Sequence, residues 1–550
     1  MDETPRITKP IVDGREVSME EALTATAAIL KANNSLLWRG SGNVGVMQEV
    51  SDLLMEQTGG ILTKGSLCDG AGAAGIEEGR GVNKTLPLEQ IEKSEVVVIW
   101  GRNVTVTNAH MMPYLEGKKL VVIDPVRTEI AKKADLFLQI APGTDYYVAL
   151  MLSRLILMED REVKVRMDEF APEYEDLYDF SREHHTKAIL QDMEIDLDDL
   201  GRLLNYLYNR KVVFLIGVGV QKYTTGSYAL HAIDSLAANL GMFGREGCGV
   251  SYLGDSKLGF ENPFKTSCKR VSKVDTAFSD FDTVLVQGGN PAESMPDSNR
   301  VRKELEGVDN LIYFGLHENE TSKMARIVIP AKSFLEKEDV RLSYGHQYVT
   351  PMKKVVDSEV GISEYDFTKA MFETLGLNGL ESEEYYINTW LSQCKEMNGE
   401  LVSPVYEAVP YSEGFGADGD DAFKFIKDHS DNFINTKRIT KYRKQRKNKS
   451  EAEMLWLVSP KSRGTINTQF KRDSRIRLNP VLGFKDGEKV KACSEYGEYL
   501  FEVKCSEDLR TDIALITSNT VGLNFLTPSV ISEEGESACY QEVKISIERV

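Results

Sequence analysis

The sequence predicts an α/β protein with two related parallel-sheet units and a small C-terminal β-barrel domain. Three observations predict this fold class. Apolar strand runs alternate with helical stretches between residues 95 and 330, one strand-to-turn pattern occurs twice, and short β-like runs dominate after residue 451. A chain of 550 residues is also too long for one hydrophobic core, which predicts two to four domains.

The repeated pattern is an apolar strand run that ends in a Gly-x-Asn turn. One copy spans residues 96–103 and contains Gly101 and Asn103, and the other spans residues 283–290. A second apolar run follows each copy, at 120–124 and 311–315. Two such βαβ half-units predict pseudo-twofold, Rossmann-like domains with two nucleotide-sized sites.

Two further glycine turns follow predicted strands. The first follows the strand at 36–38, which comes after a helix at 19–31, and the second follows the strand at 212–216. A glycine turn between a strand and a helix lets backbone amides meet an anion, although a tight turn without a ligand has the same pattern. The candidate residues in these turns are Gly40, Ser41, Gly42 and Asn43, and then Gly217, Gly219 and Gln221.

Two carboxylates are candidates for holding a nucleotide. Asp124 ends a strand about twenty residues after Gly101, where a carboxylate can accept hydrogen bonds from ribose hydroxyls or a guanine edge. Asp145 follows Gly143 at a strand-to-helix turn. Capping of a helix that begins at Tyr146 is the alternative role for Asp145.

Composition limits the classes of function. The net charge of −19 argues against a nucleic-acid binder, and no apolar run approaches the length of a membrane span. No secretion signal is visible in the acidic, polar N-terminus, so a cytoplasmic location is expected if residue 1 is the native start. None of the seven cysteines forms a C-x-x-C pair, which disfavours a zinc site or an iron–sulfur cluster within this chain.

Cys68 lies in a glycine-rich loop, residues 65–72, that enters the α/β region. The glycines permit close approach of a ligand, whereas Asp69 opposes formation of a thiolate. No histidine lies near Cys68 in the sequence, so a local Cys–His nucleophile is not indicated. From the sequence pattern alone a structural role for Cys68 is the alternative.

The expected division of the chain follows these patterns. Residues 1–62 and 300–375 form the first α/β half, and residues 63–299 form the second. Residues 376–451 form a linker with acidic and basic runs, in which the basic run at 437–449 is either solvated or a docking patch for an acidic partner. Residues 452–550 form the barrel.

Taken in order, these segments resemble the large subunits of the molybdopterin oxidoreductases. The resemblance begins at residues 6–10 and 19–22, where Met19 replaces the tryptophan usual in the family. It continues through residues 68–72, 100–103, 123–125, 142–145, 288–291, 329–331 and 336–338. Residues 459–467, 479–480 and Asn524 are similar to the C-terminal dinucleotide-binding domain of the family.

The resemblance implies a molybdenum or tungsten atom held between two pyranopterin guanine dinucleotides, with Cys68 as the protein ligand to the metal. A soft thiolate suits a metal that dithiolenes already bind. By resemblance and by position in the turns, further cofactor-binding candidates are Pro125, Gly289, Asn290, Glu320, Lys461, Asn467 and Asn524. The implied function is a catalytic subunit that carries out two-electron chemistry, as in the formate dehydrogenases, and passes electrons to a separate iron–sulfur or flavin subunit.

Three departures from the family pattern are present. Many relatives begin with a cysteine-rich segment for a [4Fe–4S] cluster, and this sequence starts just after the point where that segment would end. Formate dehydrogenases have a histidine directly after the metal ligand, where this chain has Asp69. Relatives without a cluster often use serine as the ligand, which Cys68 does not match.

Two alternatives are weighed against a molybdenum or tungsten redox enzyme. One is a cofactor-free structural subunit, similar to the large iron–sulfur subunit of respiratory NADH–quinone oxidoreductase. The other is a nicotinamide-dependent dehydrogenase, which the spacing of Gly40, Gly42 and Gly45 permits. The next strand, 61–64, lacks the acidic residue that would hold a ribose hydroxyl, and this disfavours the dehydrogenase.

Overall fold

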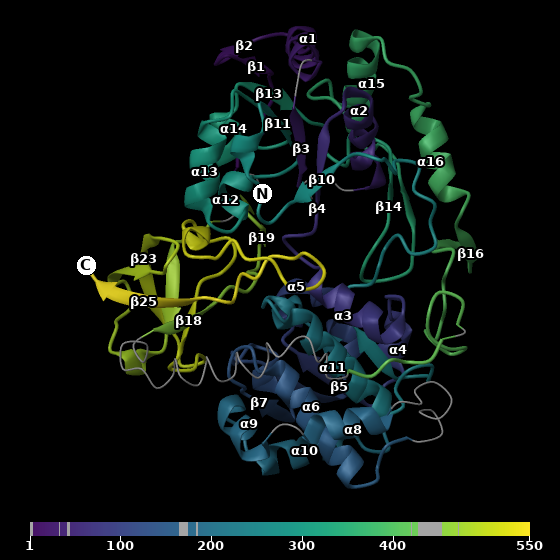
Figure 1. The fold of residues 1–550 in the computed structure, drawn as a ribbon, viewed down its shortest axis with the longest axis vertical. Coiled ribbons are helices and arrows are strands. Elements are labelled where there is room, and N and C mark those ends of the chain that lie inside the picture. Colours follow the sequence, from purple (N-terminus) through teal and green to yellow (C-terminus); the bar gives the residue numbers. More distant parts are fainter. Residues whose placement is uncertain are drawn as a thin grey trace.

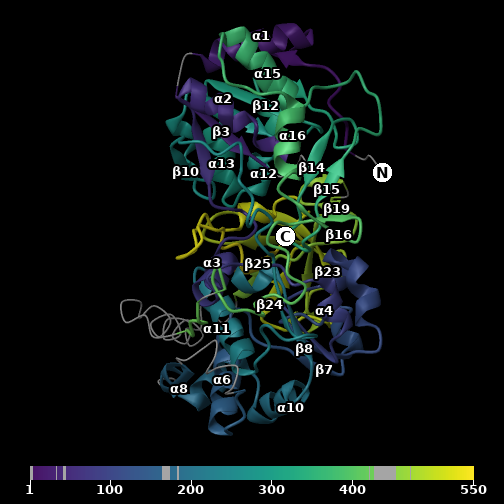
Figure 2. The same cartoon turned by 90° about the vertical axis from the view of Figure 1, so that its right-hand side faces the viewer.

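A computed structural model describes residues 4–31, 34–40, 45–163, 174–182, 185–419, 421–426, 454–470 and 472–550. Two parallel sheets form two lobes, seen at the top and bottom of Figure 1, and a barrel lies to one side of them. The view in Figure 2 also separates the upper and lower lobes.

The upper sheet has eight strands and the lower sheet five. The upper order is β10 (Arg270–Ser272), β4 (Ile61–Lys64), β3 (Ser35–Arg39), β11 (Thr283–Gln287), β12 (Asn310–Gly315), β13 (Ile327–Pro330), β1 (Ile11–Val12) and β2 (Arg15–Glu16). The lower order is β7 (Leu136–Leu138), β6 (Lys119–Ile123), β5 (Val96–Trp100), β8 (Val212–Ile216) and β9 (Gly249–Ser251). The central strands β5, β8 and β11 are buried along their whole length, as parallel strands covered on both faces should be.

Helices cover both faces of each sheet. In the upper lobe α1 (Met19–Leu30), α2 (Ser51–Thr58) and α15 (Glu364–Leu375) pack together, and α12 (Pro291–Ser294), α13 (Ser298–Glu306) and α14 (Glu320–Met324) lie on the other side (Figure 1). In the lower lobe α3 (Ala71–Arg80), α6 (Asp145–Met158) and α11 (Gly226–Asn239) share one core, beside α8 (Tyr174–Arg182), α9 (Thr186–Met193) and α10 (Leu197–Leu207). The opposite face carries α4 (Leu88–Glu92), α5 (Val104–Thr107) and the 3-10 segment Ala109–Leu115.

The two lobes repeat the same arrangement of five strands. The order β13-β12-β11-β3-β4 in the upper sheet matches β7-β6-β5-β8-β9 in the lower sheet, and all of these pairs are parallel. The two copies of the Gly-x-Asn pattern follow β5 and β11, the third strand of each matched set. The predicted α/β fold with two related parallel-sheet units is therefore confirmed.

The boundary expected at residues 299/300 does not agree with the sheet topology. β10 and β11 belong to the upper sheet, where β11 pairs with β3 and β12. Residues 270–287 thus group with residues 35–64 and not with the second half. β3 and β11 are far apart in the sequence, and no local sequence pattern indicates that they pair.

The C-terminal region is a closed barrel, as predicted. Its strands run in the order β18 (Leu455–Val458), β24 (Ile513–Leu515), β21 (Arg475–Leu478), β23 (Glu498–Cys505), β22 (Lys489–Cys493) and β25 (Lys544–Arg549). Alternate residues of β23 point into the barrel, including Phe501 and Val503, which are buried. A hairpin of β19 (Thr465–Ile466) and β20 (Gln469–Phe470) extends from the barrel toward the lobes (Figure 1).

The region predicted as a linker, residues 376–451, carries structure of its own where it is described. It contains α16 (Glu383–Leu391) and the hairpin of β16 (Lys395–Met397) and β17 (Glu400–Val402). A second hairpin, β14 (Asp339–Arg341) with β15 (Thr350–Met352), lies next to it. Tyr411, Phe415 and Phe423 pack onto Phe243 in the lower lobe. The predicted basic run at 437–449 lies outside the described residues.

Candidate functional site

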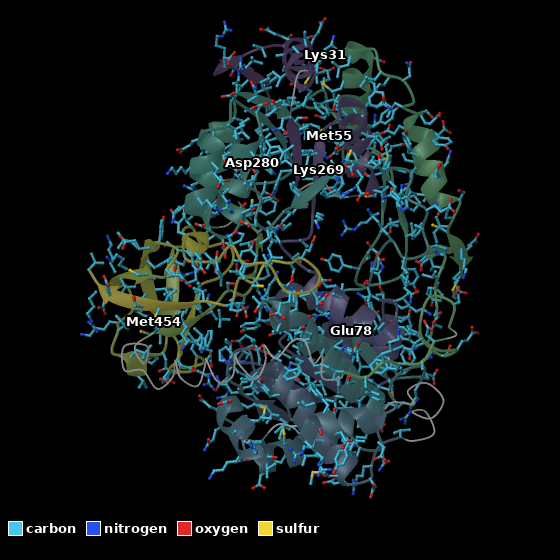
Figure 3. The ribbon with its side chains drawn as sticks, viewed as in Figure 1. Lys31, Met55, Glu78, Lys269, Asp280 and Met454 are labelled. Carbon is cyan, nitrogen blue, oxygen red and sulfur yellow. The ribbon has the colours of Figure 1, made fainter. Side chains whose placement is uncertain are left out.

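Cys68 lies on the segment that joins the two lobes. This segment leaves β4 of the upper sheet at Lys64 and enters α3 of the lower lobe at Ala71. Figure 3 labels Met55 in the upper lobe and Glu78 of α3 in the lower lobe, one on each side of this crossing. The Cys68 side chain is exposed and not packed in a hydrocarbon core, which is the setting that a metal ligand or nucleophile needs.

Hydrogen bonds fix the backbone at Cys68. Its amide donates to Ser66 Oγ at 2.9 Å, and its carbonyl accepts from Gln221 Nε2 at 2.8 Å and from Lys222 Nζ at 2.5 Å. Gln221 also accepts from the Gly72 amide at 3.1 Å, which ties the crossing segment to the start of α3. The turn after β8 therefore holds the loop that presents Cys68.

Two ammonium groups act on Cys68 electrostatically. Lys222 is buried and donates to the carbonyls of Leu67 and Cys68. Burial lowers the pKa of Lys222 to about 8, and the Cys68 side chain acts in the opposite direction. Lys461 is solvent-exposed, yet desolvation lowers its pKa too, and Cys68 again opposes the shift. Both ammonium groups are therefore close enough to Cys68 to interact with its side chain.

Asp69, which replaces the histidine expected next to a formate dehydrogenase ligand, faces away from solvent. Its Oδ1 accepts from the Tyr252 hydroxyl at 2.8 Å, and burial raises the pKa of its carboxyl group. The same tyrosine ring fills the space beside Gly72, where any side chain would overlap it. Asp69 and Tyr252 thus form a polar pair at the foot of the Cys68 loop.

The two glycine turns of the lower lobe interlock. The Gly217 amide donates to the Trp100 carbonyl at 2.8 Å, and the Gly101 amide donates to the Ile123 carbonyl at 2.8 Å. A Cβ atom at Gly217 would lie 2.8 Å from the Arg102 Cα and closer still to the Gly101 carbonyl. Gly101 has φ +60°, which glycine tolerates best. The turns after β5 and β8 can approach only because both carry glycine.

The upper lobe repeats this interlock. The Gly40 amide donates to the Gln287 carbonyl at 2.8 Å, and the Gly288 amide donates to the Phe314 carbonyl at 2.8 Å. A Cβ atom at Gly40 would lie 2.5 Å from the Gly289 Cα, and one at Gly289 would overlap the Trp38 ring. The predicted turn residues Ser41, Gly42 and Asn43 lie outside the described residues.

An open cavity of about 220 Å³ lies beside the Gly40 turn. It is lined by side chains at the ends of β3, β4 and β10 and from the region of α2: Leu37, Arg39, Gln48, Glu49, Asp52, Leu62, Thr63, Arg270 and Lys273. Lys273 is largely enclosed there and donates to the Arg39 carbonyl at 2.8 Å, and its burial lowers its pKa to about 8. The cavity is therefore polar and partly cationic.

Asp124 and Asp145, two of the predicted carboxylates, lie near each other and are both buried. Asp124 Oδ1 accepts from the Val126 amide at 2.8 Å, and Asp145 Oδ1 accepts from the Trp100 indole at 2.8 Å. Burial raises the pKa of Asp124 to about 7, with the negative charge of Asp145 adding to the shift, and burial raises the pKa of Asp145 to about 6. Donors from a bound nucleotide base or ribose would compensate both carboxylates.

The capping alternative for Asp145 is wrong. The helix α6 begins at Asp145 itself, and its N-cap residue is Thr144. Because its carboxylate accepts from the Trp100 indole, Asp145 couples the end of β5 to the start of α6.

We expect Asp124→Asn to stabilise the cofactor-free protein above neutral pH. A carboxyl group with a folded-state pKa near 7 and an unfolded value near 4 holds its proton more tightly when folded, so the wild type loses stability as the pH rises from about 4 to 7. The amide keeps the acceptor for Val126 without the charge. Urea unfolding should give the variant an advantage of roughly 2–4 kcal/mol at pH 8 that shrinks at pH 5.

Asp135 provides a control of opposite sign. Its pKa is lowered by hydrogen bonds from the Lys119 ammonium and the Leu120 amide, so Asp135→Asn should lose stability at pH 8. An advantage of Asp124→Asn that is the same at pH 5 and pH 8 would contradict the account, because a pH-independent gain does not come from ionisation.

Three other candidates lie at the lower turns. Asn103 is the N-cap residue of α5, and its Oδ1 accepts from the Thr105 hydroxyl at 2.8 Å. The Pro125 carbonyl accepts from Gln139 Nε2 at 3.1 Å. Gly143 has φ +73° and lies against the Tyr223 ring. All three stand at the carboxyl ends of the lower strands, where the open sheet of an α/β domain binds ligands.

Asn290 and Asn524 meet at the junction of the upper lobe and the barrel. Asn290 Oδ1 accepts from the Thr321 hydroxyl at 2.9 Å, and its Nδ2 donates to Glu293 at 3.0 Å. Asn524 Nδ2 donates to the Glu293 carbonyl at 2.7 Å. Arg472 forms an ion pair with the Glu293 carboxylate. The α12 helix thereby docks the barrel beside the β11 turn.

The remaining candidates do not all converge. Lys461 donates to Asn467, which stands in the turn of the barrel hairpin with φ +51°. Glu320 is the first residue of α14, and its pKa is lowered chiefly by a hydrogen bond from Lys323 at 2.8 Å. Gly219 has room for a methyl group, since a Cβ atom added there would make an ordinary contact at 3.7 Å with its nearest neighbour, on Gln541.

Three polar residues of this region were not among the predicted site residues: Lys222, Tyr252 and Arg102. Lys222 follows Gln221 directly, and Arg102 occupies the variable position of the first Gly-x-Asn turn, so their places in the motifs were available signals. Their burial and their partners arise only in the folded chain.

Comparison with known proteins identifies the family. The model of the molybdopterin oxidoreductase family matches residues 6–364. The chain belongs to this family. The resemblance predicted from the sequence is thus confirmed, and the match includes the Cys68 loop and all the turns described above except those of the barrel.

Individual relatives agree with the family. The chain is 26% identical to a probable oxidoreductase, YyaE, from Bacillus subtilis (68% of this chain, 60% of that protein). It is 24% identical to the F420-dependent formate dehydrogenase subunit alpha of Methanocaldococcus jannaschii (88% and 79%). It is also 24% identical to the assimilatory nitrate reductase catalytic subunit of B. subtilis (60% and 55%). The chain spans 60% of YyaE and 55% of the nitrate reductase subunit, less than two thirds of each.

A solved structure supports the fold. Acetylene hydratase from Pelobacter acetylenicus superposes with a TM-score of 0.76 at 14% identity, covering 100% of this chain and 93% of that one. At this identity the likeness concerns the fold, including the paired lobes and the barrel. Within the described residues, no helix combines the length and apolar character needed to cross a bilayer.

Proposed function

We propose that the protein is the catalytic subunit of an oxidoreductase that binds molybdenum or tungsten between two pyranopterin guanine dinucleotides. The observation that carries this proposal is the repeated interlock of glycine turns, Gly40 with Gly288 and Gly217 with Gly101, one in each lobe. Two matched turns fit two matched nucleotide tails, and Cys68 lies on the segment between the lobes.

The residues fit such a cofactor chemically. Asp124 and Asp145 offer two desolvated carboxylates to the donor edge of a guanine and to ribose hydroxyls in the lower lobe. Lys222 and Lys461 offer positive charge to a thiolate, a dithiolene or a phosphate near Cys68. The Cys68 sulfur would be the protein ligand to the metal. A bound metal of this kind supplies a centre that gains and loses an electron pair.

The polypeptide supplies position and electrostatics around that centre. Gln221 and Lys222 hold the Cys68 carbonyl and so orient the loop that bears the sulfur. Asp69 and Tyr252 form the polar floor beside it. Glu293 joins the barrel to the upper lobe through Arg472 and Asn524, which keeps the C-terminal dinucleotide-binding residues against the β11 turn.

Electrons would pass to or from a separate iron–sulfur or flavin subunit. Relatives that are named as alpha subunits of F420-dependent formate dehydrogenases support an assembly with other chains. Formate and nitrate are the substrates in the names of the relatives, and both are small oxyanions. Asp69 in place of a histidine weighs against formate as the substrate here.

The cofactor-free alternative receives less support. A chain that serves only as a scaffold has no need for an exposed cysteine beside a buried lysine, and bulky residues would be expected to fill the turns. Cys68 is exposed beside the buried Lys222, and a methyl group added at Gly219 would meet no atom closer than 3.7 Å.

A redox titration tests this function. Protein purified from a host supplied with molybdate and tungstate should be poised at a series of potentials and followed by electron paramagnetic resonance. We expect the signal of an odd-electron metal state that rises and then falls as the potential is lowered. Protein that contains metal and pterin but shows no change of oxidation state at any potential would overturn the proposed redox role and leave the fold assignment intact.

A further inference from the structure

Arg102 is a buried cation without a carboxylate partner. Its side chain is 9% exposed. Nε and Nη2 both donate to one neutral acceptor, Asn108 Oδ1, each at 3.1 Å. Nη1 is buried and has no hydrogen-bond partner among the described residues. Burial without a compensating anion lowers the pKa of Arg102 to about 10.

Three other buried cations of the described residues are paired with carboxylates, whereas the buried Lys222 donates to the carbonyls of Leu67 and Cys68. Arg80 forms a two-point ion pair with Asp234 at 2.6 and 2.5 Å, and Lys337 pairs with Glu364 at 2.5 Å. Lys84 pairs with Glu407 at 2.5 Å. An unpaired buried charge costs several kcal/mol in general. The Arg102 guanidinium, whose Nη1 has no partner among the described residues, is therefore suited to binding an anion from outside the chain.

Arg102 lies in the region between the two lobes. Arg102 follows β5 in the lower lobe and is coupled electrostatically to Tyr252 and Tyr344. Tyr252 contacts Asp69, the neighbour of Cys68. Tyr344 lies on the loop between β14 and β15, which reaches down from the upper side in Figure 1, and its carbonyl accepts from the Gly254 amide at 2.9 Å. The single hydroxyl proton of Tyr252 is already donated to Asp69, so Tyr344 is the phenol of this pair that can donate to an anion beside Arg102.

We propose that Arg102, with Tyr344 beside it, forms a receptor for an oxyanion at the site between the lobes. The guanidinium fork matches a carboxylate, a nitrate-like planar anion or a phosphate, because each presents two oxygens in one plane to two N–H groups. The oxyanion comes either from a small substrate or from the diphosphate of the pterin dinucleotide. The inference rests on the proposed function for its biological ligand, but the anion binding itself does not.

The test compares Arg102→Gln with wild type and with Arg202→Gln. Arg202 is an exposed arginine on α10, which lies at the lower end of Figure 1 and carries none of the candidate site residues, so its loss changes the net charge equally without touching the site. Binding of sodium pyrophosphate, sodium nitrate and sodium formate to each full-length protein is measured by calorimetry. The molybdenum, tungsten and pterin contents of each purified protein are measured in parallel.

We expect at least one anion to bind wild type and to bind Arg102→Gln roughly 10- to 100-fold more weakly, the loss expected for charge-assisted hydrogen bonds. Arg202→Gln should bind like wild type. Weaker pyrophosphate binding with a reduced pterin content identifies the cofactor diphosphate as the source. Weaker nitrate or formate binding with an unchanged pterin content identifies a substrate.

The stability of Arg102→Gln shows whether Arg102 serves to bind an anion or to stabilise the fold. Without anions, Arg102→Gln should be at least as stable as wild type, because the variant no longer buries an unpaired charge. The proposal is overturned if no anion binds wild type, if Arg102→Gln binds all three as wild type does, if Arg202→Gln loses binding equally, or if Arg102→Gln is markedly less stable without anions. Each of these outcomes can occur whether or not the protein proves to be a redox enzyme.

Discussion

Gly217→Ala should destabilise the protein by roughly 3 kcal/mol or more, whereas Gly219→Ala, in the same turn, should be nearly neutral. A methyl group at Gly217 would overlap the Gly101 carbonyl and approach the Arg102 Cα to 2.8 Å. Both obstacles are backbone atoms, which cannot move aside as a flexible side chain can. At Gly219 the nearest atom is 3.7 Å away, so an added methyl group fits.

Chemical denaturation of the two variants measures this difference directly. The backbone at Gly217 has φ −94°, which alanine also adopts, so the loss would come from overlap and not from backbone strain. Equal stability of Gly217→Ala and Gly219→Ala would contradict the interlock of the two lower turns. Gly40→Ala should repeat the large effect in the upper lobe, because its methyl group would meet the backbone of Gly288 and Gly289.

Cys68→Ala should lower the activity of the metal-loaded enzyme by roughly 100-fold or more, since even outer partners of a metal ligand contribute 10- to 100-fold. X-ray absorption at the metal edge should detect one sulfur neighbour fewer than in wild type. Cys68→Ser, which offers an oxygen ligand, should keep more of the metal than Cys68→Ala.

Cys493→Ser is the matched control for Cys68. Cys493 lies on β22 of the barrel, away from the crossing segment between the lobes, and its thiol contacts Glu498. Its replacement should leave metal content and activity unchanged. Wild-type activity and an unchanged sulfur count in Cys68→Ala would remove Cys68 from the proposed site.

The sequence was sufficient to predict the elements with strong local patterns. The runs at 96–100, 212–216 and 283–287 are apolar throughout, which is typical of buried parallel strands, and the glycine turns that follow them are local too. The β-strand character of the barrel region was also predictable, because its short strands carry local sequence patterns. The identity of the family then followed from the order of these segments.

Features that depend on long-range packing were not predictable in this way. The pairing of β3 with β11 joins residues nearly 250 positions apart, and no local pattern marks it, so the domain boundary was misplaced. The role of Asp145 depends on the Trp100 indole, which the fold brings to it from β5. The importance of Arg102 and Lys222 lies in what surrounds them after folding. Both are buried, and Arg102 donates to Asn108 while Lys222 donates to the carbonyls of Leu67 and Cys68.

The central claim is that two matched turns hold two guanine dinucleotides on either side of one metal atom. The most direct measurement is the ratio of guanosine monophosphate, released by mild acid hydrolysis, to molybdenum plus tungsten in the purified protein. The account predicts two guanosine monophosphates for each metal atom. Protein from a metal-supplied host that releases no guanosine monophosphate and contains no metal would contradict it.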